Sequence, residues 1–355
     1  MFDDIIGNSQ VKNYLSTMIK KNAIGNSFLF AGIEGIGKSL FAEALAKLVL
    51  KVETLKNQPD VHIYRPEGKI GMHSIDSMRH MCEKVYLAPF SSDRKVFIIH
   101  NAEKMLPTSA NSLLKTFEEP SPDTIMILLS SNPNALLPTV LSRCRTIRFH
   151  HIPEDEISHF LTTNFKKTTS EAKQLASLSG GSLGKAIRLC ENESDLIRNQ
   201  LIELLSKGKV KFYSEIISAS KSTYELIEEI KKQEEIAVKT ELTKDYNSDL
   251  TALQLQHLNK GIDGAVSLRQ SDFALAVFEV ILSWTRDLHL LKNGGHPSYL
   301  INADCLEKLQ INLKTGKFHS IESVQKMIGE AKLLLERSTS LNIVLENLFL
   351  KLELI

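Results

Sequence analysis

Short apolar runs rich in β-branched and aromatic residues alternate with helical patterns along the first 150 residues. Apolar residues recur every three or four positions between these runs, as in amphipathic helices. Strands that alternate with helices favour a parallel sheet covered by helices. The predicted strands are FLFA (28–31), VHIYR (61–65), KVFIIH (95–100), TIMILLS (124–130) and RTIRFH (145–150), and the predicted helices are SQVKNYLSTMIKK (9–21), KSLFAEALAKLVL (38–50), SIDSMRHMCEKVYL (74–87) and SANSLLKTFEE (109–119).

The β-rich runs disappear after HIPEDE (151–156), and helical patterns continue to the end. Gly180 and Gly181 separate two helices of a small unit, and the charge-rich stretch 224–258 is typical of a long solvated helix. LNIVLENLFLKLELI (341–355) is apolar on more than one face, which predicts burial in its own bundle or against another subunit. We therefore predict an α/β domain over 1–151, a small helical domain over 152–195 and an all-α domain over 196–355.

Composition narrows the class of protein. Apolar residues make up 43% of the 355 residues, enough for one large core or several smaller ones, and 43 Lys and Arg balance 42 Asp and Glu. The cysteines, at 82, 144, 190 and 305, form no Cys-x-x-Cys pair, which is typical of a reducing compartment. MFDDIIGNSQ resembles no signal peptide, and no apolar run approaches about 18 residues. We expect a cytoplasmic protein without a membrane partner.

The segment GIEGIGKS (32–39) fits the phosphate-binding pattern G-x-x-x-x-G-K-[ST]. Gly32, Gly35 and Gly37 would let backbone amides face a β-phosphate, Lys38 would reach the β- and γ-oxygens, and Ser39 would hold Mg²⁺. The segment follows the strand FLFA and opens a helix, as this chemistry requires. The alternative is a glycine-rich turn whose lysine faces water, but it does not explain the setting between a strand and a helix.

The next candidate strand with the right exit, VFIIHNAEKM (96–105), lacks the acidic residues that P-loop enzymes place there. Magnesium prefers hard oxygen ligands to His100, and Asn101 can orient a water but cannot take its proton. Asp93 precedes the strand, and Glu103 could reach the site only if the strand ended later. We therefore predict that ATP or ADP binds with weakly held Mg²⁺ and is hardly hydrolysed. The alternative for His100 is a partly buried polar residue without function.

Two further segments, NSLLKTFEEP (111–120) and SSNPNALLPTVLSRCR (130–145), resemble the bacterial replication clamp-loader subunits of the AAA+ class. FDDIIGNSQV (2–11) adds to this resemblance, which covers about the first 190 residues, and NIVLENLFLKL (342–352) extends it weakly to the end. The resemblance implies an AAA+ P-loop domain with a five-stranded parallel sheet, a small helical lid domain and a helical collar that joins subunits.

The resemblance also implies roles for particular residues. In this family the motif Ser142–Arg143–Cys144 carries an arginine finger that points into the ATP site of a neighbouring subunit. Without the family, Arg143 would be an ordinary surface arginine. Ser131, after the strand TIMILLS, takes the position of the first nucleotide sensor.

The family separates motor subunits from stators. Motors carry Asp-Glu where His100 and Asn101 stand, and a sensing arginine where GSLG (181–184) offers Gly184. Many relatives also carry four zinc-binding cysteines where KVETLKNQPDVHIYRPEG (51–68) has none, so no zinc is expected. The resemblance therefore implies a stator of the DNA polymerase III clamp loader, without its own ATPase.

A stator of this kind implies gamma/tau and delta subunits, the sliding clamp and primer-template DNA as partners. Two alternatives stay open. The first is an active clamp-loader motor, gamma/tau-like or of archaeal type, with Glu103 as its base. The second is a P-loop kinase or transferase, which would need an acceptor site and a lid.

Overall fold

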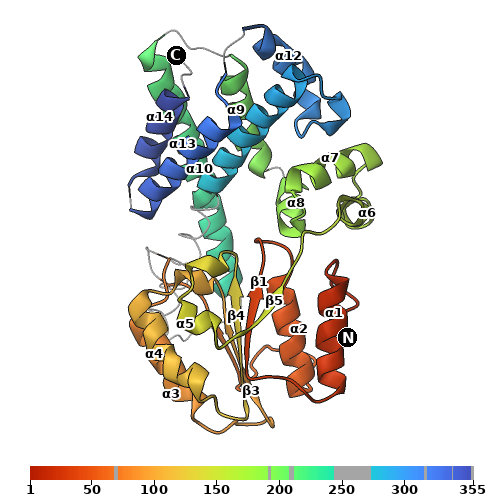
Figure 1. Ribbon diagram of the computed structural model, residues 1–355, viewed down its shortest axis with the longest axis vertical. Helices are drawn as coiled ribbons and strands as arrows, with labels where there is room; N and C mark the ends of the chain where they lie inside the picture. Colours follow the sequence, from red (N-terminus) through yellow and green to blue (C-terminus); the bar gives the residue numbers. More distant parts are fainter. Residues whose placement is uncertain are drawn as a thin grey trace. The chain divides into compact units, whose positions relative to one another are not determined.

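The computed structural model describes all residues except 68–70, 191–192, 208–211, 244–272, 316–317, 338 and 353–355. The described chain forms two compact units, which are drawn together in Figure 1. The first unit runs from Met1 to Ile187, and the second contains Arg188–Thr243 and the described residues from 273 onward.

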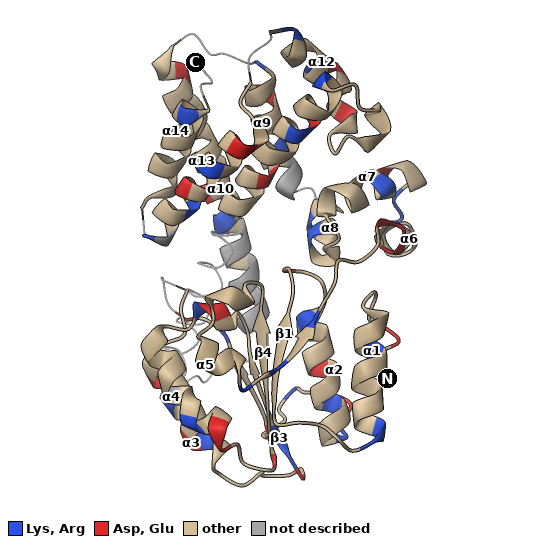
Figure 2. Cartoon of the chain, viewed as in Figure 1, with Lys and Arg blue, Asp and Glu red and all other residues tan. Residues whose placement is uncertain are grey.

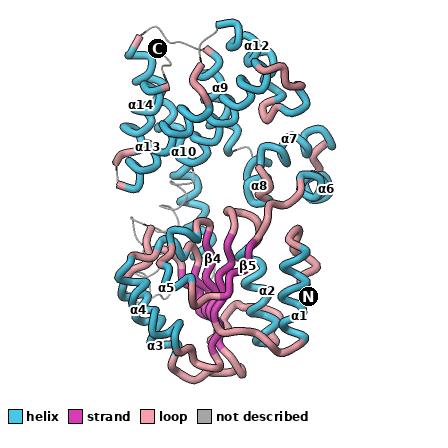
Figure 3. Tube along the Cα trace, viewed as in Figure 1, coloured by secondary structure: helices cyan, strands magenta, loops and turns pink. Residues whose placement is uncertain are grey.

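A five-stranded parallel sheet is the centre of the first unit (Figure 3). The strand order is β2-β3-β4-β1-β5, so β1 pairs with both β4 and β5. Every residue of β3 and β4 is buried, as expected for parallel strands covered on both faces. The strands are β1 (Ser27–Ala31), β2 (Val61–Tyr64), β3 (Lys95–Ile99), β4 (Thr124–Ser130) and β5 (Arg145–Arg148).

Helices cover both faces of this sheet. Phe28 and Phe30 face α1 and α2, whereas Leu29 faces α3, α4 and α5, because successive strand residues point to opposite faces. The two clusters make a core on each side of the sheet. The helices are α1 (Ser9–Lys20), α2 (Lys38–Leu50), α3 (Ile75–Val85), α4 (Pro107–Glu118) and α5 (Pro138–Leu141).

A short helical segment follows the sheet. It contains α6 (Glu154–Phe165), α7 (Thr169–Ser179) and the start of α8 (Leu183–Cys190). Thr168 and Glu171 form a capping box that begins α7. Gly180 and Gly181, with φ of 59° and 85°, end that helix in the left-handed region, where they separate α7 from α8. The domain boundary predicted at residue 151 stays a prediction.

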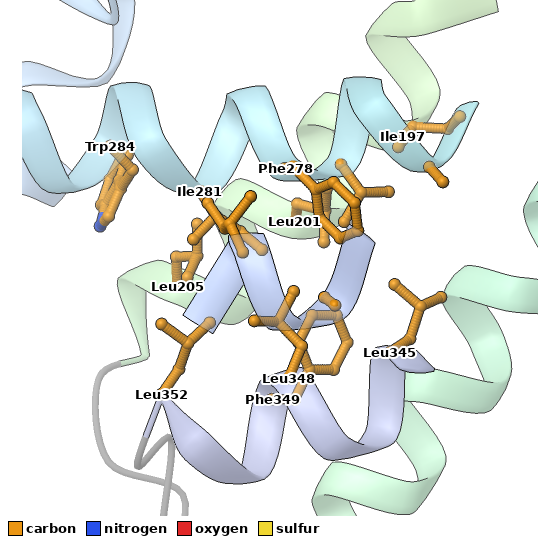
Figure 4. Close-up of a cluster of buried hydrophobic side chains, with 14 of the residues drawn as sticks. Ile197, Leu201, Leu205, Phe278, Ile281, Trp284, Leu345, Leu348, Phe349 and Leu352 are labelled. Atoms are coloured by element: carbon orange, nitrogen blue, oxygen red, sulfur yellow. The ribbon is translucent and has the colours of Figure 1, made fainter. Parts of the chain in front are cut away.

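The second unit is entirely helical in its described part. Its core is a single hydrophobic cluster to which all the longer helices contribute (Figure 4). Phe349 and Leu345 of α14 belong to the same cluster as Phe278, so the last described helix is buried in its own bundle. The helices are α9 (Glu193–Ser206), α10 (Tyr213–Thr243), the helical residues 273–292, α12 (Leu306–Thr315), α13 (Ile321–Glu336) and α14 (Leu341–Lys351).

The charge-rich stretch forms part of α10, which has 31 residues. Ile227 and Ile230 of this helix are buried in the cluster, so α10 is packed on one side as well as solvated on the other. Residues 244–258 of the predicted solvated helix lie outside the described residues. The fold class predicted from sequence, α/β followed by all-α, is confirmed.

Acidic and basic residues are interspersed on the helices of both units (Figure 2), in line with the balanced overall charge. In the part of the chain that the structure describes, no helix is both long enough and apolar enough to cross a membrane.

A buried carboxylate fixes the loop before β3. Asp60 is 2% exposed, and it accepts hydrogen bonds from the backbone N–H groups of Phe90, Ser91 and Ser92 and from the Ser91 hydroxyl. Burial by itself would raise the pKa of Asp60, but these hydrogen bonds lower it to about 2. The charged form therefore stabilises the fold.

We expect Asp60→Asn to reduce the free energy of unfolding by about 2 kcal/mol at pH 7. The folded-state pKa of Asp60 is lowered, so its stabilisation is present above the unfolded-state value near 4 and is lost as the pH falls toward about 2. Urea unfolding of both proteins between pH 7 and pH 2 should therefore show a difference that shrinks below about pH 4. Asp93→Asn, at a side chain that is 91% exposed, is the control and should behave like the wild type.

Candidate functional site

The glycine-rich loop joins β1 to α2. Gly35 and Gly37 have φ of 73° and 94°, a conformation that side chains other than glycine rarely adopt. Gly32 lies so close to Ile36 and to the Phe149 carbonyl that a Cβ would meet them at 2.5 and 2.8 Å. The conformation and packing of this loop therefore require glycine at these three positions. The loop leads directly into the N-terminus of α2.

Lys38 is the first residue of α2, and its ammonium group folds back onto the loop. Its Nζ donates hydrogen bonds to the carbonyl oxygens of Gly32 at 2.6 Å and Ile33 at 2.7 Å. Burial lowers the pKa of Lys38 to about 8, against the opposing effect of the Glu103 and Glu34 carboxylates. An anion in the loop would replace the two carbonyl acceptors and favour the charged form of Lys38.

A cavity of about 460 Å³ opens beside this loop within the first unit. Its polar side combines an ammonium group, a hydroxyl group and the start of a helix, which suits an anion. Much of its remaining wall is apolar, which suits a flat organic ring, and the carboxylate residues Asp4 and Glu34 also line it. The polar lining includes Lys38, Ser39, Asn101 and Ser131, and the apolar lining includes Ile5, Ile6, Ile152, Phe160, Leu183 and Ile187.

His100 and Asn101 line the same cavity, directly after β3. The His100 backbone N–H donates to the Tyr64 carbonyl at 2.9 Å, and its carbonyl accepts from His73 Nε2 at 2.7 Å. Burial, with Arg65 and His73 nearby, lowers the pKa of His100 to about 3. His100 is therefore neutral at physiological pH and supplies neither a charge nor a hard oxygen ligand.

Glu103 reaches the end of the sheet although β3 ends at Ile99, one residue before the end predicted from sequence. Asn101 has a φ of 48°, and the 3₁₀ turn Ala102–Lys104 that follows brings the Glu103 carboxylate to Ser131, after β4. Glu103 Oε1 accepts from the Ser131 N–H at 3.2 Å and from its hydroxyl at 2.5 Å. Strand length alone does not predict this position of the Glu103 carboxylate, because it does not reveal a turn that redirects the chain.

Gly184 lies directly against the glycine-rich loop. Its N–H donates to the Gly35 carbonyl at 2.9 Å, and the Ser182 hydroxyl donates to the Glu34 carbonyl at 2.8 Å. A Cβ on Gly184 would lie 2.9 Å from the Gly35 Cα. Any side chain at position 184 would therefore force this segment away from the loop.

Arg143 lies in the turn between α5 and β5 and is not among the residues that line the cavity. Its guanidinium pairs with Glu118, with Nη2 and Oε1 2.5 Å apart. Arg145 instead lies over the Tyr14 ring, 4.9 Å from its centroid. The two arginines therefore differ in surroundings, since Arg143 stands in a turn and Arg145 is the first residue of β5.

None of the four cysteines, all of which lie among the described residues, forms a disulfide bond, and Cys144 and Cys190 are buried. Among the described residues, no group of three His, Cys, Asp or Glu side chains lies close enough together to hold a metal ion.

The fold and the loop define a P-loop-type α/β domain followed by helices. Residues 7–153 match the family model described as DNA polymerase III, delta subunit. The chain is 30% identical to the DNA polymerase III subunit delta-prime of Bacillus subtilis over 200 residues, which cover 52% of this chain and 59% of the relative. It is 31% identical to the delta-prime subunit of Pseudomonas aeruginosa, over 51% of this chain and 61% of the relative.

The chain also resembles the gamma/tau subunit of Mycoplasma pneumoniae, with 26% identity over 59% of this chain and 33% of the relative. A solved structure of a gamma subunit-related protein from Thermotoga maritima aligns with a TM-score of 0.41 and 17% identity, over 75% of this chain and 99% of that one. The chain thus spans about three-fifths of the delta-prime relatives and a third of the gamma/tau relative. The sequence matches confirm the predicted resemblance to DNA polymerase III clamp-loader subunits, delta-prime among them.

We expect Gly184→Ala to destabilise the first unit by about 1–3 kcal/mol, because the added methyl group cannot fit against the Gly35 backbone. Hydrogen exchange at the residue 184 amide should accelerate as its bond to Gly35 weakens. Gly329→Ala is the matched control, since that glycine lies inside α13 with nothing within 4 Å of the added Cβ. It should stabilise the chain by up to about 1 kcal/mol. Equal effects of the two substitutions would contradict the close packing at Gly184.

Proposed function

We propose that this chain is a delta-prime-like stator subunit of a replication clamp loader. In this role it binds ATP or ADP without hydrolysing it, and it helps neighbouring motor subunits to load a sliding clamp onto primed DNA. The similarity to delta-prime and gamma/tau subunits of DNA polymerase III supports this role. The partners we propose are gamma/tau and delta subunits, with the sliding clamp and primer-template DNA engaged through the complex.

One observation carries the proposal. A single cavity combines the P-loop residues Lys38 and Ser39 with His100 and Asn101 at the end of β3. The first pair suits phosphate. The second pair is poorly suited to take a proton from water at neutral pH, because partial burial, with Arg65 and His73 nearby, lowers the pKa of His100 to about 3 and an amide is not a base. The cavity therefore favours binding over hydrolysis.

The residues of the site fit a nucleotide better than they fit a metal ion. Lys38 and the amides at the start of α2 would hold the phosphates, and the apolar wall with Ile152 and Phe160 would cover the base. Ser39 offers one hydroxyl to Mg²⁺, which would neutralise phosphate charge when bound. Because His100 and Asn101 stand where acids would add ligands, the site should hold Mg²⁺ weakly.

Glu103 supports the competing proposal of an active gamma/tau-like motor, since its carboxylate lies at the end of the sheet. The same oxygen of Glu103 accepts both hydrogen bonds from Ser131, and Glu103 does not line the cavity. A general base must reach the attacking water, so we favour a structural role for Glu103. Steady ATP turnover by the purified chain alone, abolished in Glu103→Gln, would establish the motor instead.

The position of Arg143 supports the proposal that this chain contributes to catalysis in a neighbouring subunit. It lies outside the chain's own cavity, in a turn that begins β5, and its side chain is 33% exposed. An arginine that acts on a neighbour's nucleotide must be accessible in this way. Such an arginine stabilises the charge that develops on the transferred phosphoryl group, and is typically worth about 10³ to 10⁵ in rate.

We expect nucleotide affinity of the isolated chain to fall as the pH rises above about 8. The pKa of Lys38 is lowered to about 8 in the free protein, and bound phosphate should raise it, so binding takes up a proton in this range. The dissociation constant for ADP should increase by up to about tenfold per pH unit between pH 8 and the pKa of the bound form. Calorimetry in buffers of different ionisation enthalpy measures the proton uptake directly.

Lys38→Arg is the control for this pH dependence, because a guanidinium stays charged throughout the range. Its affinity for ADP should be independent of pH between 7 and 10. If the slope persists in Lys38→Arg, another group is responsible; if neither protein binds ADP or ATP, the nucleotide-binding part of the proposal is wrong.

We expect Arg143→Ala to lower the ATPase rate of the assembled complex, stimulated by DNA and clamp, by at least about tenfold at the affected site. Assembly and nucleotide binding by the neighbour should be nearly unchanged, because the arginine acts on transition-state charge. Arg143→Lys should restore the rate only in part, since an ammonium group lacks the planar fork.

Arg145→Ala is the positional control for the arginine finger. Arg145 lies over Tyr14, so its loss should affect packing locally and leave loading intact. An effect of Arg145→Ala without an effect of Arg143→Ala would mean that the wrong arginine has been assigned, and no effect of either would refute the arginine finger.

A further inference from the structure

Arg143 is held by its own chain through three hydrogen bonds. Its Nη1 donates to the Thr139 carbonyl at 3.0 Å and to the Ser142 hydroxyl at 3.2 Å, and its Nη2 donates to Glu118 Oε1 at 2.5 Å. The first two partners lie within four residues of Arg143, whereas Glu118 is 25 residues away in sequence. Glu118 is therefore the contact that ties Arg143 to a different element of the fold.

These three hydrogen bonds do not occupy all the N–H donors of the Arg143 guanidinium. An arginine has five N–H donors, so two remain when three are engaged. Two donors are what a forked contact with two phosphoryl oxygens requires. Arg143 can therefore contact an anion while it is still held by Glu118.

Both ends of the Arg143–Glu118 contact are anchored in one hydrophobic cluster. Glu118 is the last residue of α4 and follows Phe117, which is 4% exposed. Arg143 stands between Val140 and Cys144, which are 1% and 9% exposed and belong to the same cluster as Phe117. The carboxylate and the turn that carries Arg143 are therefore fixed relative to each other by packing.

We infer that Glu118 is a positioning residue that holds the Arg143 guanidinium ready for the nucleotide of a neighbouring subunit. The functional part of this inference rests on the proposed role of Arg143. An arginine side chain has many rotamers, and fixing it before the reaction removes an entropic cost from the rate-determining step. An exposed ion pair contributes little to stability, so the effect of Glu118 on rate should be separable from any effect on folding.

The first experiment examines the isolated chain and needs no partner. The Nε–H signal of Arg143 in ¹⁵N NMR is assigned by its loss in Arg143→Lys, and its order parameter is measured. Glu118→Ala should make this signal clearly more mobile, whereas Glu119→Ala should not. Glu119 is the matched control because it is the adjacent, exposed carboxylate. Equal mobility in the wild type and in Glu118→Ala would overturn the inference.

The second experiment measures the stimulated ATPase of the complex reconstituted with cognate gamma/tau and delta subunits. Glu118→Ala should lower kcat about three- to tenfold with KM unchanged, and Glu119→Ala should leave both unchanged. Glu118→Gln keeps an oxygen acceptor without the charge, so its kcat should lie within about twofold of the wild type. In the Arg143→Ala background, Glu118→Ala should have no further effect.

The outcomes separate the two proposals. If Arg143→Ala does not slow the complex, the proposed arginine finger is wrong, and the NMR experiment alone decides whether Glu118 holds Arg143. If Arg143→Ala slows the complex but Glu118→Ala raises the rate, the carboxylate restrains the arginine and the positioning role is overturned. A loss in Glu118→Ala that Glu119→Ala shares, or that persists without Arg143, also overturns it.

Discussion

The parallel pairing of β1, β3 and β4 is the constraint on which the rest of the first unit depends. Ala31 pairs with Ser130, and Ile99 pairs with Leu128, so these three strands end at the same edge of the sheet. Helices cover both faces, and a shift of one residue would exchange the residues that face α2 with those that face α3. The register therefore brings Gly32, His100 and Ser131 to one place, although each comes from a different part of the sequence.

The glycine-rich loop is stabilised by backbone contacts as much as by its own conformation. Gly184 and Ser182 bond to the carbonyl groups of Gly35 and Glu34, and Lys38 bonds to two further carbonyl groups of the same loop. These carbonyl groups lie in a partly buried loop, and their hydrogen-bond partners come from within the chain. A nucleotide would compete with Lys38 for its acceptors, so affinity at this site reflects a difference between two sets of contacts.

The two candidate functional regions of the first unit differ in kind. The cavity beside α2 is partly apolar, and it is lined by Lys38, whose charge is disfavoured by burial. Arg143 lies outside this cavity on a short turn. Its guanidinium pairs with the Glu118 carboxylate, and its three hydrogen bonds leave two N–H donors unused. This arrangement supports the proposed role, in which Arg143 acts on the nucleotide of another subunit and the chain's own cavity binds nucleotide without hydrolysis.

Sequence alone determined much of this protein, because local patterns carry the relevant physics. Short apolar runs rich in β-branched and aromatic residues identified the five strands, and the motif at residues 32–39 identified a loop whose positive φ angles require glycine. The absence of acids at residues 100 and 101 was also visible in sequence, since strand β3 ends where its apolar run ends.

Only the tertiary structure decided how distant residues meet. The turn after Asn101 carries Glu103 to Ser131, and no periodicity predicts such a change of direction. Likewise, the sequence showed at Gly184 only that the sensing arginine of motor subunits is absent. In the fold, Gly184 lies so close to the Gly35 backbone that a side chain has no room. The sequence left open whether the last helix packs in its own bundle or against a partner, and the structure places Phe349 in the core of the second unit. Contacts between residues far apart in the chain depend on register, turns and packing together, which is why they appear only when the chain is folded.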